Sequence, residues 1–364
     1  MVVAIRRHSP QNEASGAAER PLFAMKKTVA FGEILLRLSP PGQERFMQSP
    51  VLGATFGGGE ANVALGLAGL GVHSRFVTRL PAHSIGDAAL RTLRAEGVDT
   101  EHVVRGGSRV GIYYAEGGVH PRSSTVVYDR SHSAITDLDP EAVDWDRVFS
   151  GAHWFHVSGI TPALGPKPQA CTLAALAAAK RAGVTVSFGV HYRAKLWSPE
   201  DAQRVLRPLL SYVDIVLANE DDIRYGLGVT RNRTERTGET GSSESYRQLS
   251  ERVANEFSVQ MVAMTVKDRM SASESSWSGL LYEQGSNTLF ESVRYSVSVV
   301  EAIGASDAFT AGLIYAVLAG RSAERALAFA VAAGALKHTI PGDYNRVSAS
   351  EVDRLVAGEA TLTR

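Results

Sequence analysis

Val299–Thr310 reads Val-Val-Glu-Ala-Ile-Gly-Ala-Ser-Asp-Ala-Phe-Thr, a turn of small residues that leads through an acid into an apolar helix pattern. The turn Gly304-Ala305-Ser306 places Asp307 at the start of a helix predicted over Ala308–Leu318. A helix N-terminus can bind an anion, because its first N–H groups are unpaired and the helix dipole is positive there. Asp307 would lie beside a bound phosphate and could orient or deprotonate a hydroxyl, although the dipole is expected to lower its pKa. The alternative interpretation is that Asp307 only caps the helix.

The composition favours one large α/β domain in a chain of 364 residues, 44% of them hydrophobic. The formal net charge is zero, so nothing in the totals indicates nucleic acid or an anionic membrane as a partner. The single cysteine, Cys171, excludes an internal disulfide, suits a reducing cytoplasm and is interpreted as core packing. No apolar run approaches the roughly 20 residues of a membrane span. Residues 1–24 lack a signal-peptide core and are expected to be either a disordered extension or the result of a misplaced start, before a domain at 25–364.

Strand and helix patterns alternate regularly in the second part of the chain. Such alternation predicts a central, mostly parallel sheet with helices on both faces, and ligands bound at the carboxyl ends of its strands. Candidate ligand-binding residues follow the predicted strands at Ile160, Arg193, Asn219 and Lys267. The strands are predicted at Thr28–Phe31, Phe76–Thr78, His153–Val157, Val184–Phe188, Ile215–Leu217 and Met261–Val266, and the helices at Ala88–Ala95, Gln169–Ala182, Pro199–Leu210, Tyr246–Phe257, Ala308–Leu318 and Ala323–Lys337.

The first part of the chain contains a different pattern of short alternating strands. These strands lie within about 35–56 and 103–134, and they are predicted to form a small β-sheet lid over the main sheet. A glycine-rich run, Gly57-Gly58-Gly59-Glu60-Ala61-Asn62, opens a helix between them. A dinucleotide-binding loop is the rival reading, but Asn62 occupies the place of the third glycine of G-x-G-x-x-G. Asn62 could also be an ordinary surface residue of the helix. Residues 230–245 are predicted to be a loop.

Two of these motifs resemble the signatures of the PfkB (ribokinase-like) family of sugar kinases. The glycine-rich run resembles the first signature, Gly-Gly-x-x-x-Asn, and Glu301–Asp307 resembles the second, Asp-Thr-x-Gly-Ala-Gly-Asp. The resemblance implies a ribokinase-like fold with a β-lid. It implies that Asp307 is the catalytic base, that Gly304, Ala305 and Ser306 form an anion hole, and that Gly58 and Asn62 contact the sugar.

Several phrases resemble a branch of the family that phosphorylates 2-keto-3-deoxygluconate. They are Tyr128-Asp129-Arg130, Ser158-Gly159-Ile160-Thr161, Tyr192-Arg193-Ala194-Lys195-Leu196-Trp197, Ser271-Ala272-Ser273 and Lys337-His338-Thr339-Ile340-Pro341-Gly342-Asp343. The resemblance implies that the sugar acid contacts Gly58, Tyr113, Tyr128, Arg130, Ile160, Arg193 and Asp343. The chemistry agrees, because the planar guanidinium groups of Arg130 and Arg193 can each bind a carboxylate through two parallel hydrogen bonds. Each arginine by itself could equally be a solvated surface residue.

Further matches to the family pattern imply which residues bind the nucleotide. Asn219 and Asp222 resemble the family's Asn-x-x-Glu, which holds water around Mg²⁺, so Asp222 is expected to act on the metal through water. Thr265 and Lys267 resemble the strand end near the phosphates of ATP. No Gly-x-x-x-x-Gly-Lys-Ser/Thr loop occurs, which argues against a P-loop kinase.

The chain departs from the family pattern at five positions, all of them near the phosphate end. Glu301 replaces Asp, Ser306 replaces Gly, Asp222 replaces Glu, and Gly189 and His191 stand where Asp-x-Asn is usual. If Ser306 had a positive φ, it would cost roughly 1–2 kcal/mol. His191 could titrate near neutral pH or be structural.

Together with the composition, the resemblance implies a cytoplasmic kinase that uses ATP and Mg²⁺ to phosphorylate the C6 hydroxyl of 2-keto-3-deoxygluconate. A homodimer or larger homo-oligomer is expected through the lid. Two alternatives remain open: a kinase of another sugar such as fructose, and a degenerate kinase that binds a sugar acid without turning it over.

Overall fold

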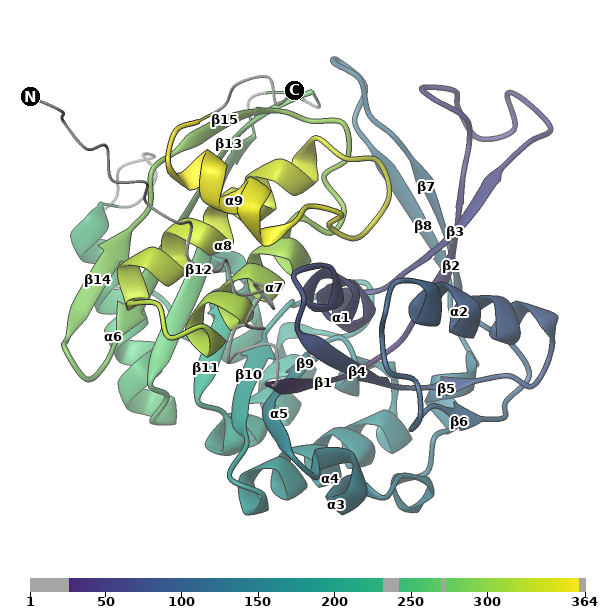
Figure 1. The fold of residues 1–364 in the computed structure, drawn as a ribbon, viewed down its shortest axis with the longest axis horizontal. Helices are drawn as coiled ribbons and strands as arrows, with labels where there is room; N and C mark the ends of the chain where they lie inside the picture. Colours follow the sequence, from purple (N-terminus) through teal and green to yellow (C-terminus); the bar gives the residue numbers. More distant parts are fainter. Residues whose placement is uncertain (1–25, 232–241, 270, 272, 360–364) are drawn as a thin grey trace, which may run out of the picture.

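The core of the molecule is a nine-stranded, mostly parallel sheet between two layers of helices (Figure 1). The computed structural model describes residues 26–231, 242–269, 271 and 273–359. The parallel strands, in spatial order, are β4 (His73–Val77), β1 (Lys27–Phe31), β9 (Ala152–Ser158), β10 (Thr185–Gly189), β11 (Ile215–Ala218) and β12 (Met261–Arg269). Three antiparallel strands extend the sheet beyond β12: β13 (Glu274–Glu283), β14 (Thr288–Glu291) and β15 (Tyr295–Ser298). The predicted fold class is confirmed.

Helices cover both faces of the sheet because its central strands are apolar on both sides. In β11, Ile215 and Leu217 pack on one face, and Val216 and Ala218 pack on the other. The first face is covered by α1 (Gly59–Gly69), α7 (Ala305–Leu318), α8 (Ala323–His338) and α9 (Ala349–Val356). The second is covered by α3 (Trp145–Phe149), α4 (Pro166–Arg181), α5 (Pro199–Leu209) and α6 (Ser243–Phe257), and α2 (Ser84–Ala95) packs beside α1. Cys171 of α4 is fully buried in this core, as predicted.

A separate four-stranded sheet forms the predicted lid, which projects from the main body in Figure 1. Its strands are β3 (Gly53–Gly57), β2 (Leu35–Ser39), β7 (Ile112–Glu116) and β8 (Thr125–Asp129), in that order. Strand β2 leaves the main sheet directly after β1, so the lid is rooted at the carboxyl edge of the parallel strands. This placement creates an enclosed space between the lid and the strand ends.

Parts of the expected strand pattern are wrong. The segment 43–52 contains turns rather than strand, because its polar residues have no neighbouring strand to pair with. Val104–Arg105 (β6) pairs with Arg79–Leu80 (β5) beside the main body and does not belong to the lid. Strands β13, β14 and β15 were not predicted, because the serine-rich sequence 273–298 shows no clear alternation.

Two predicted segments fall partly or wholly outside the described residues. The expected extension at 1–24 lies outside them, as does 232–241 of the expected loop. Helix α6 begins at Ser243, which is earlier than the sequence pattern indicates. Among the described ranges, no helix has the length and apolarity needed to cross a membrane.

Candidate active site

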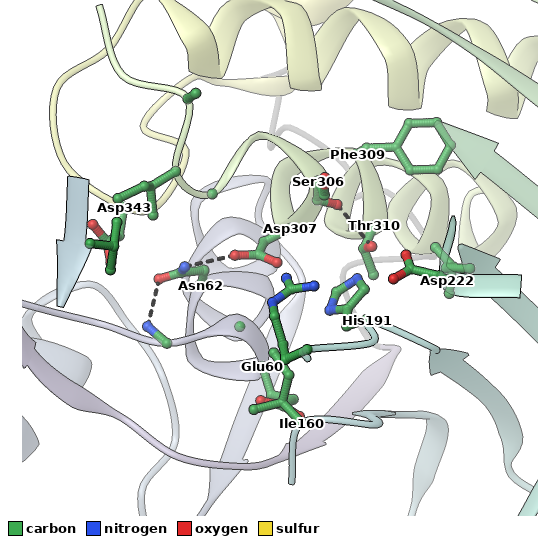
Figure 2. A pocket seen from close by; sticks show the side chains of 18 of the residues that line it. Glu60, Asn62, Ile160, His191, Asp222, Ser306, Asp307, Phe309, Thr310 and Asp343 are labelled. Atoms are coloured by element: carbon green, nitrogen blue, oxygen red, sulfur yellow. Dashed lines mark hydrogen bonds between the residues drawn. The ribbon is translucent and has the colours of Figure 1, made fainter. Parts of the chain in front are cut away.

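A cavity of about 260 Å³ lies between the lid and the carboxyl ends of the parallel strands. It contains nearly every residue that the sequence singled out, and Figure 2 shows several of these side chains pointing into it from opposite sides. The exception is Ala305, which is fully buried in the first turn of α7. The predicted residues that line the cavity are Gly58, Asn62, Tyr113, Tyr128, Arg130, Ile160, Arg193, Asn219, Asp222, Thr265, Lys267, Gly304, Ser306, Asp307 and Asp343.

Gly304 sets the position of the α7 N-terminus at the cavity. It is the N-cap of α7 with a φ of 82°, in the left-handed region that favours glycine. A Cβ at this position would lie 1.5 Å from the carbonyl oxygen of Asp343. Ser306 lies inside the helix and has no positive φ, so the backbone cost expected for this serine does not arise. The N–H of Ala305 donates to the carbonyl oxygen of Ala302 at 3.4 Å, and the N–H groups of Ser306 and Asp307, whose residues line the cavity, have no intrahelical partner.

Asp307 is the buried acid of the cavity. Its Oδ2 accepts a hydrogen bond from Asn62 Nδ2 at 2.7 Å, and the residue is only 9% exposed (Figure 2). Burial raises the pKa of this carboxyl group to about 7, and the hydrogen bond from Asn62 offsets only part of that effect. The expected lowering of the pKa by the helix dipole is wrong, because desolvation is larger. The capping interpretation is also wrong, because Gly304 occupies the N-cap and Asp307 bonds to another helix.

Asn62 connects the two signature motifs. Its Oδ1 accepts from the backbone N–H of Gly58 at 3.2 Å while its amide donates to Asp307, so α1 holds the carboxylate of α7 in place. Asn62 is buried, and the surface-residue reading is wrong. Residue 58 must be glycine for the chain to pass this close to Glu33, because a Cβ at Gly58 would lie 2.1 Å from the carbonyl oxygen of Glu33. Asn62 therefore orients the carboxylate of Asp307 and also lines the cavity.

Glu60 is a buried acid that the sequence analysis treated only as part of a helix start. Its Oε1 accepts from the backbone N–H of Ser158 at 3.0 Å, from the hydroxyl of Ser158 at 2.6 Å and from the hydroxyl of Thr161 at 2.8 Å. Burial raises its pKa. These bonds tie the first turn of α1 to the loop after β9, which carries Ile160.

A second network joins the lid to the loops around α7. Arg37 of β2 is buried and donates to Asp343 Oδ1 at 2.5 Å and to Glu301 Oε2. Tyr113 of β7 donates its hydroxyl hydrogen to the other carboxylate oxygen of Asp343. Glu301 Oε1 in turn accepts from the N–H of Ile303 at 3.1 Å, just before α7. Arg37 was not predicted from the sequence. Its ion pair with Glu301 explains why the longer side chain of glutamate is accommodated where the family usually has aspartate.

Arg130 is not a free cation in this structure. Its guanidinium donates through Nε and Nη2 to Glu33 Oε2 and lies 5.4 Å from the ring centroid of Tyr128. The hydroxyl of Ser133 donates to the other oxygen of Glu33. Glu33 was also missed, although an acid directly after strand β1 was a usable signal. Arg130 lines the cavity with its charge already balanced.

Arg193 differs from Arg130 in this respect. Its Nη1 donates to the carbonyl oxygen of Tyr192 at 2.9 Å, and the described chain places no carboxylate within ion-pair distance of it. The residue is exposed at the cavity rim. Arg193 is therefore the guanidinium available to an incoming anion.

The nucleotide end predicted from sequence is also assembled at the cavity. Lys267 Nζ donates to Ser306 Oγ at 3.2 Å, so the serine that replaces glycine is held by the cation of β12. Asn219 and Asp222 brace one another: Asp222 N–H donates to Asn219 Oδ1 at 2.8 Å, and Asn219 N–H donates to Asp222 Oδ2 at 3.1 Å. Burial raises the pKa of Asp222. The expectation that His191 titrates near neutral pH is wrong, because burial lowers its pKa well below the usual value.

Comparison with known proteins agrees with this geometry. The family model described as pfkB family carbohydrate kinase matches residues 25–349. A 2-dehydro-3-deoxygalactonokinase of Haloferax volcanii is 34% identical over 330 residues, covering 91% of this chain and 96% of that protein. A 2-dehydro-3-deoxygluconokinase of Thermoproteus tenax is 29% identical over 331 residues, covering 89% and 92%. The crystal structure of 2-dehydro-3-deoxygluconokinase from Thermotoga maritima superposes with a TM-score of 0.87 at 43% identity, covering 92% of this chain and 98% of the other.

Proposed function

The chain belongs to the pfkB family of carbohydrate kinases, and from that premise we propose that it transfers the γ-phosphoryl group of ATP to the C6 hydroxyl of 2-keto-3-deoxygluconate. One observation carries the proposal. A buried carboxylate, Asp307, lies at a helix N-terminus in the same cavity as the guanidinium of Arg193, which has no carboxylate partner among the described residues. The first two features suit phosphoryl transfer to a hydroxyl, and the third suits a substrate that is itself an acid.

The charge balance of the cavity supports a sugar acid over a neutral sugar. Arg130 is neutralised by Glu33, whereas Arg193 is a guanidinium of the lining that pairs with no carboxylate in the described part of the chain. Tyr113 and Tyr128 come from the lid and give the cavity aromatic walls, with ring centroids 5.9 Å apart. A neutral sugar has no carboxylate to pair with this guanidinium. We therefore assign the substrate carboxylate to Arg193, whereas Arg130 lines the cavity in an ion pair with Glu33.

The chemical step follows from the position of Asp307. Its carboxylate accepts the proton of the C6 hydroxyl as that oxygen forms a bond to the γ-phosphorus. The bond between the γ-phosphorus and the bridging oxygen breaks, and ADP leaves with the electron pair. The N–H groups at the start of α7 and the ammonium of Lys267 stabilise charge on the phosphoryl oxygens. Asn62 keeps the carboxylate oriented toward the substrate.

The residues at the other end of the cavity fit ATP and Mg²⁺. Lys267 and the α7 N-terminus offer positive charge to the phosphates, and Asp222 presents a carboxylate in the cavity lining. Magnesium keeps several waters and needs few protein carboxylates, so Asp222 and Asn219 would hold it through water. When bound, the metal neutralises charge on the phosphate oxygens.

The raised pKa of Asp307 predicts a distinct pH profile. The base must be ionised to accept a proton, so kcat/KM is expected to rise about tenfold per pH unit below about 7 and to level off above it. Steady-state rates between pH 5.5 and 9 measure this. A profile that is flat from pH 5.5 to 7 would show that Asp307 keeps a low pKa or does not accept the proton.

Gly304 offers a test of the α7 N-terminus. Gly304→Ala is expected to lower kcat by at least about 10²-fold, because the backbone must move away from Asp343 and displace the reacting groups by about an ångström. Gly320→Ala is the matched control: Gly320 has a φ of 72° but open space around its Cβ position. Its variant is expected to cost about 1 kcal/mol of stability and leave kcat unchanged. Equal kcat values in the two variants would contradict the assigned role of the turn.

The substrate assignment is tested by ADP release with a panel of sugars. The proposal expects the highest kcat/KM with 2-keto-3-deoxygluconate or its C4 epimer 2-keto-3-deoxygalactonate, compared with gluconate, fructose and ribose. Turnover only with a neutral sugar would favour the fructose-like alternative. Binding of the keto-deoxy acid without turnover of any sugar would favour the degenerate kinase, which the departures at His191 and Ser306 motivate. The homo-oligomer stays a prediction, for which exposed apolar side chains on the lid, Met47, Val51 and Val127, would supply a surface.

A further inference from the structure

Two of the departures from the family pattern, Gly189 and His191, occur together at the end of β10. Gly189 is the last residue of the strand, and His191 follows it in the loop that also carries Arg193. The ring of His191 is 9% exposed and lines the cavity (Figure 2). The mechanism above gives it no task.

The imidazole of His191 lacks a partner. In the described part of the chain, neither ring nitrogen takes part in a hydrogen bond. The ring nitrogens are not among the enclosed polar atoms that lack a partner, so they are open to the cavity. A ligand that fills the cavity would remove them from water, which costs free energy unless the ligand pairs with them. The backbone of His191 is also held at a φ of 41°, an uncommon conformation for a residue other than glycine. Both features favour a functional role over simple packing.

The size of residue 189 is matched to this ring. A Cβ at Gly189 would lie 3.1 Å from Cε1 and Nε2 of His191, closer than ordinary contact. An acid at 189, as the family usually has, would push the imidazole out of its present position. The absence of a side chain at Gly189 therefore leaves room for the imidazole of His191.

The position of the ring indicates which group it meets. On one side lies Asp307, the proposed base beside the C6 hydroxyl (Figure 2). On the other lie Asp222, which accepts from the N–H of Tyr192 at 2.8 Å, and the nucleotide end with Lys267. The group that passes between these two ends during the reaction is the phosphoryl group. Burial lowers the pKa of His191, and the positive charges of Arg193 and Lys267 lower it further, so the imidazole is neutral and has one N–H donor.

We propose that the imidazole of His191 donates a hydrogen bond to an oxygen of the phosphoryl group in transit between ATP and the sugar acid. This assignment rests on the proposed phosphotransfer. Because the contact is made to the moving group, it stabilises the transition state more than either ground state. His191 is then a catalytic residue, because it contacts the group that is transferred.

The test compares His191→Ala, His191→Leu and His191→Asn. Alanine and leucine remove the donor, and leucine keeps the volume in case alanine destabilises the fold. Both are expected to lower kcat by about 10²-fold, with the KM of each substrate within threefold, as for removal of one transition-state donor. Asparagine, which retains an N–H donor, is expected to recover most of the rate. His132→Ala, an exposed histidine that also has a positive φ, serves as the control and should match the parent protein.

A binding measurement separates this inference from the proposed function. The transition-state mimic ADP, Mg²⁺ and aluminium fluoride, added with 2-keto-3-deoxygluconate, is titrated by calorimetry against each variant. The inference predicts about 10²-fold weaker binding of the mimic in the alanine and leucine variants, and unchanged binding of ADP·Mg²⁺ alone. Equal affinity of the mimic in all variants would overturn the role of His191, whether or not the parent protein turns over a sugar.

The glycine partner gives an independent readout. Gly189→Asp alone is expected to lose at least as much kcat as His191→Ala, because the new side chain displaces the ring. Combined with His191→Asn, it should regain the rate of the single asparagine variant, since the pair then has the usual family residues. Additive losses in the double variant would contradict the coupling.

Discussion

Asp307→Asn is expected to lower kcat by at least about 10³-fold while leaving the KM for both substrates within threefold. Asparagine keeps the shape of the side chain and can still pair with Asn62, but it cannot accept the proton of the attacking hydroxyl. The variant is therefore a specific test of the base and leaves the cavity in place. A loss below tenfold would show that Asp307 only positions groups.

The same variant should be more stable than the parent protein at alkaline pH. Burial raises the pKa of Asp307 from 3.8 to about 7, which corresponds to roughly 4 kcal/mol of unfavourable free energy once the buried group is ionised. This cost grows as the pH rises from about 4 to 7 and is constant above that range. Asparagine removes it, so Tm is expected to rise by a few degrees at pH 8 and by about half as much at pH 5.5. A lower Tm in the variant at pH 8 would contradict the burial argument.

Arg193→Ala is expected to raise the KM for 2-keto-3-deoxygluconate by about 10²-fold. Two charge-assisted hydrogen bonds to the substrate carboxylate are lost, and every 1.4 kcal/mol corresponds to about a factor of ten. The KM for ATP should change little. Arg193→Lys keeps the charge but loses the planar two-pronged donor, so about a tenfold increase is expected.

A matched control is available on α5. Arg204 is an exposed arginine that pairs with Asp201 on the helix surface, away from the cavity. Arg204→Ala should leave both KM values unchanged, because a surface ion pair of this kind contributes little. If Arg193→Ala changes the KM no more than this control, the substrate carboxylate does not bind Arg193.

The positions of the site residues were predictable because each is marked by local sequence. Asp307 follows small residues at a helix start, Asn62 follows a glycine run, and Arg193 and Lys267 come at strand ends. The carboxyl ends of parallel strands meet at one edge, so local signals of this kind converge in space. The structure confirms that convergence, with the shared cavity between lid and sheet.

The charge partners were not predictable in the same way. Arg37 pairs with Glu301 and Asp343, which lie 264 and 306 residues away along the chain. No periodic pattern marks such a pairing, and it becomes visible only when the lid and the α7 loop are placed together. The ion pair between Arg130 and Glu33 also forms only in the folded chain. For this reason the sequence did not show that Arg193, and not Arg130, is the guanidinium without a carboxylate partner among the described residues.

The pKa of Asp307 shows why local electrostatics misleads here. A helix start is visible in the sequence, and its dipole alone would lower the pKa. The opposing effect, desolvation, depends on how α1 packs on α7 and on how the lid covers the cavity. Both are properties of the folded chain, and the second effect is larger.

Phosphorus NMR of the product gives the most direct test of the account. The protein is incubated with ATP, Mg²⁺ and 2-keto-3-deoxygluconate, and the Asp307→Asn variant is run in parallel. The account predicts a phosphomonoester signal coupled to the two protons of C6, growing in equal amount with ADP and absent with the variant. An ester coupled to a single proton, release of inorganic phosphate alone, or the same ester formed at a comparable rate by the variant would contradict it.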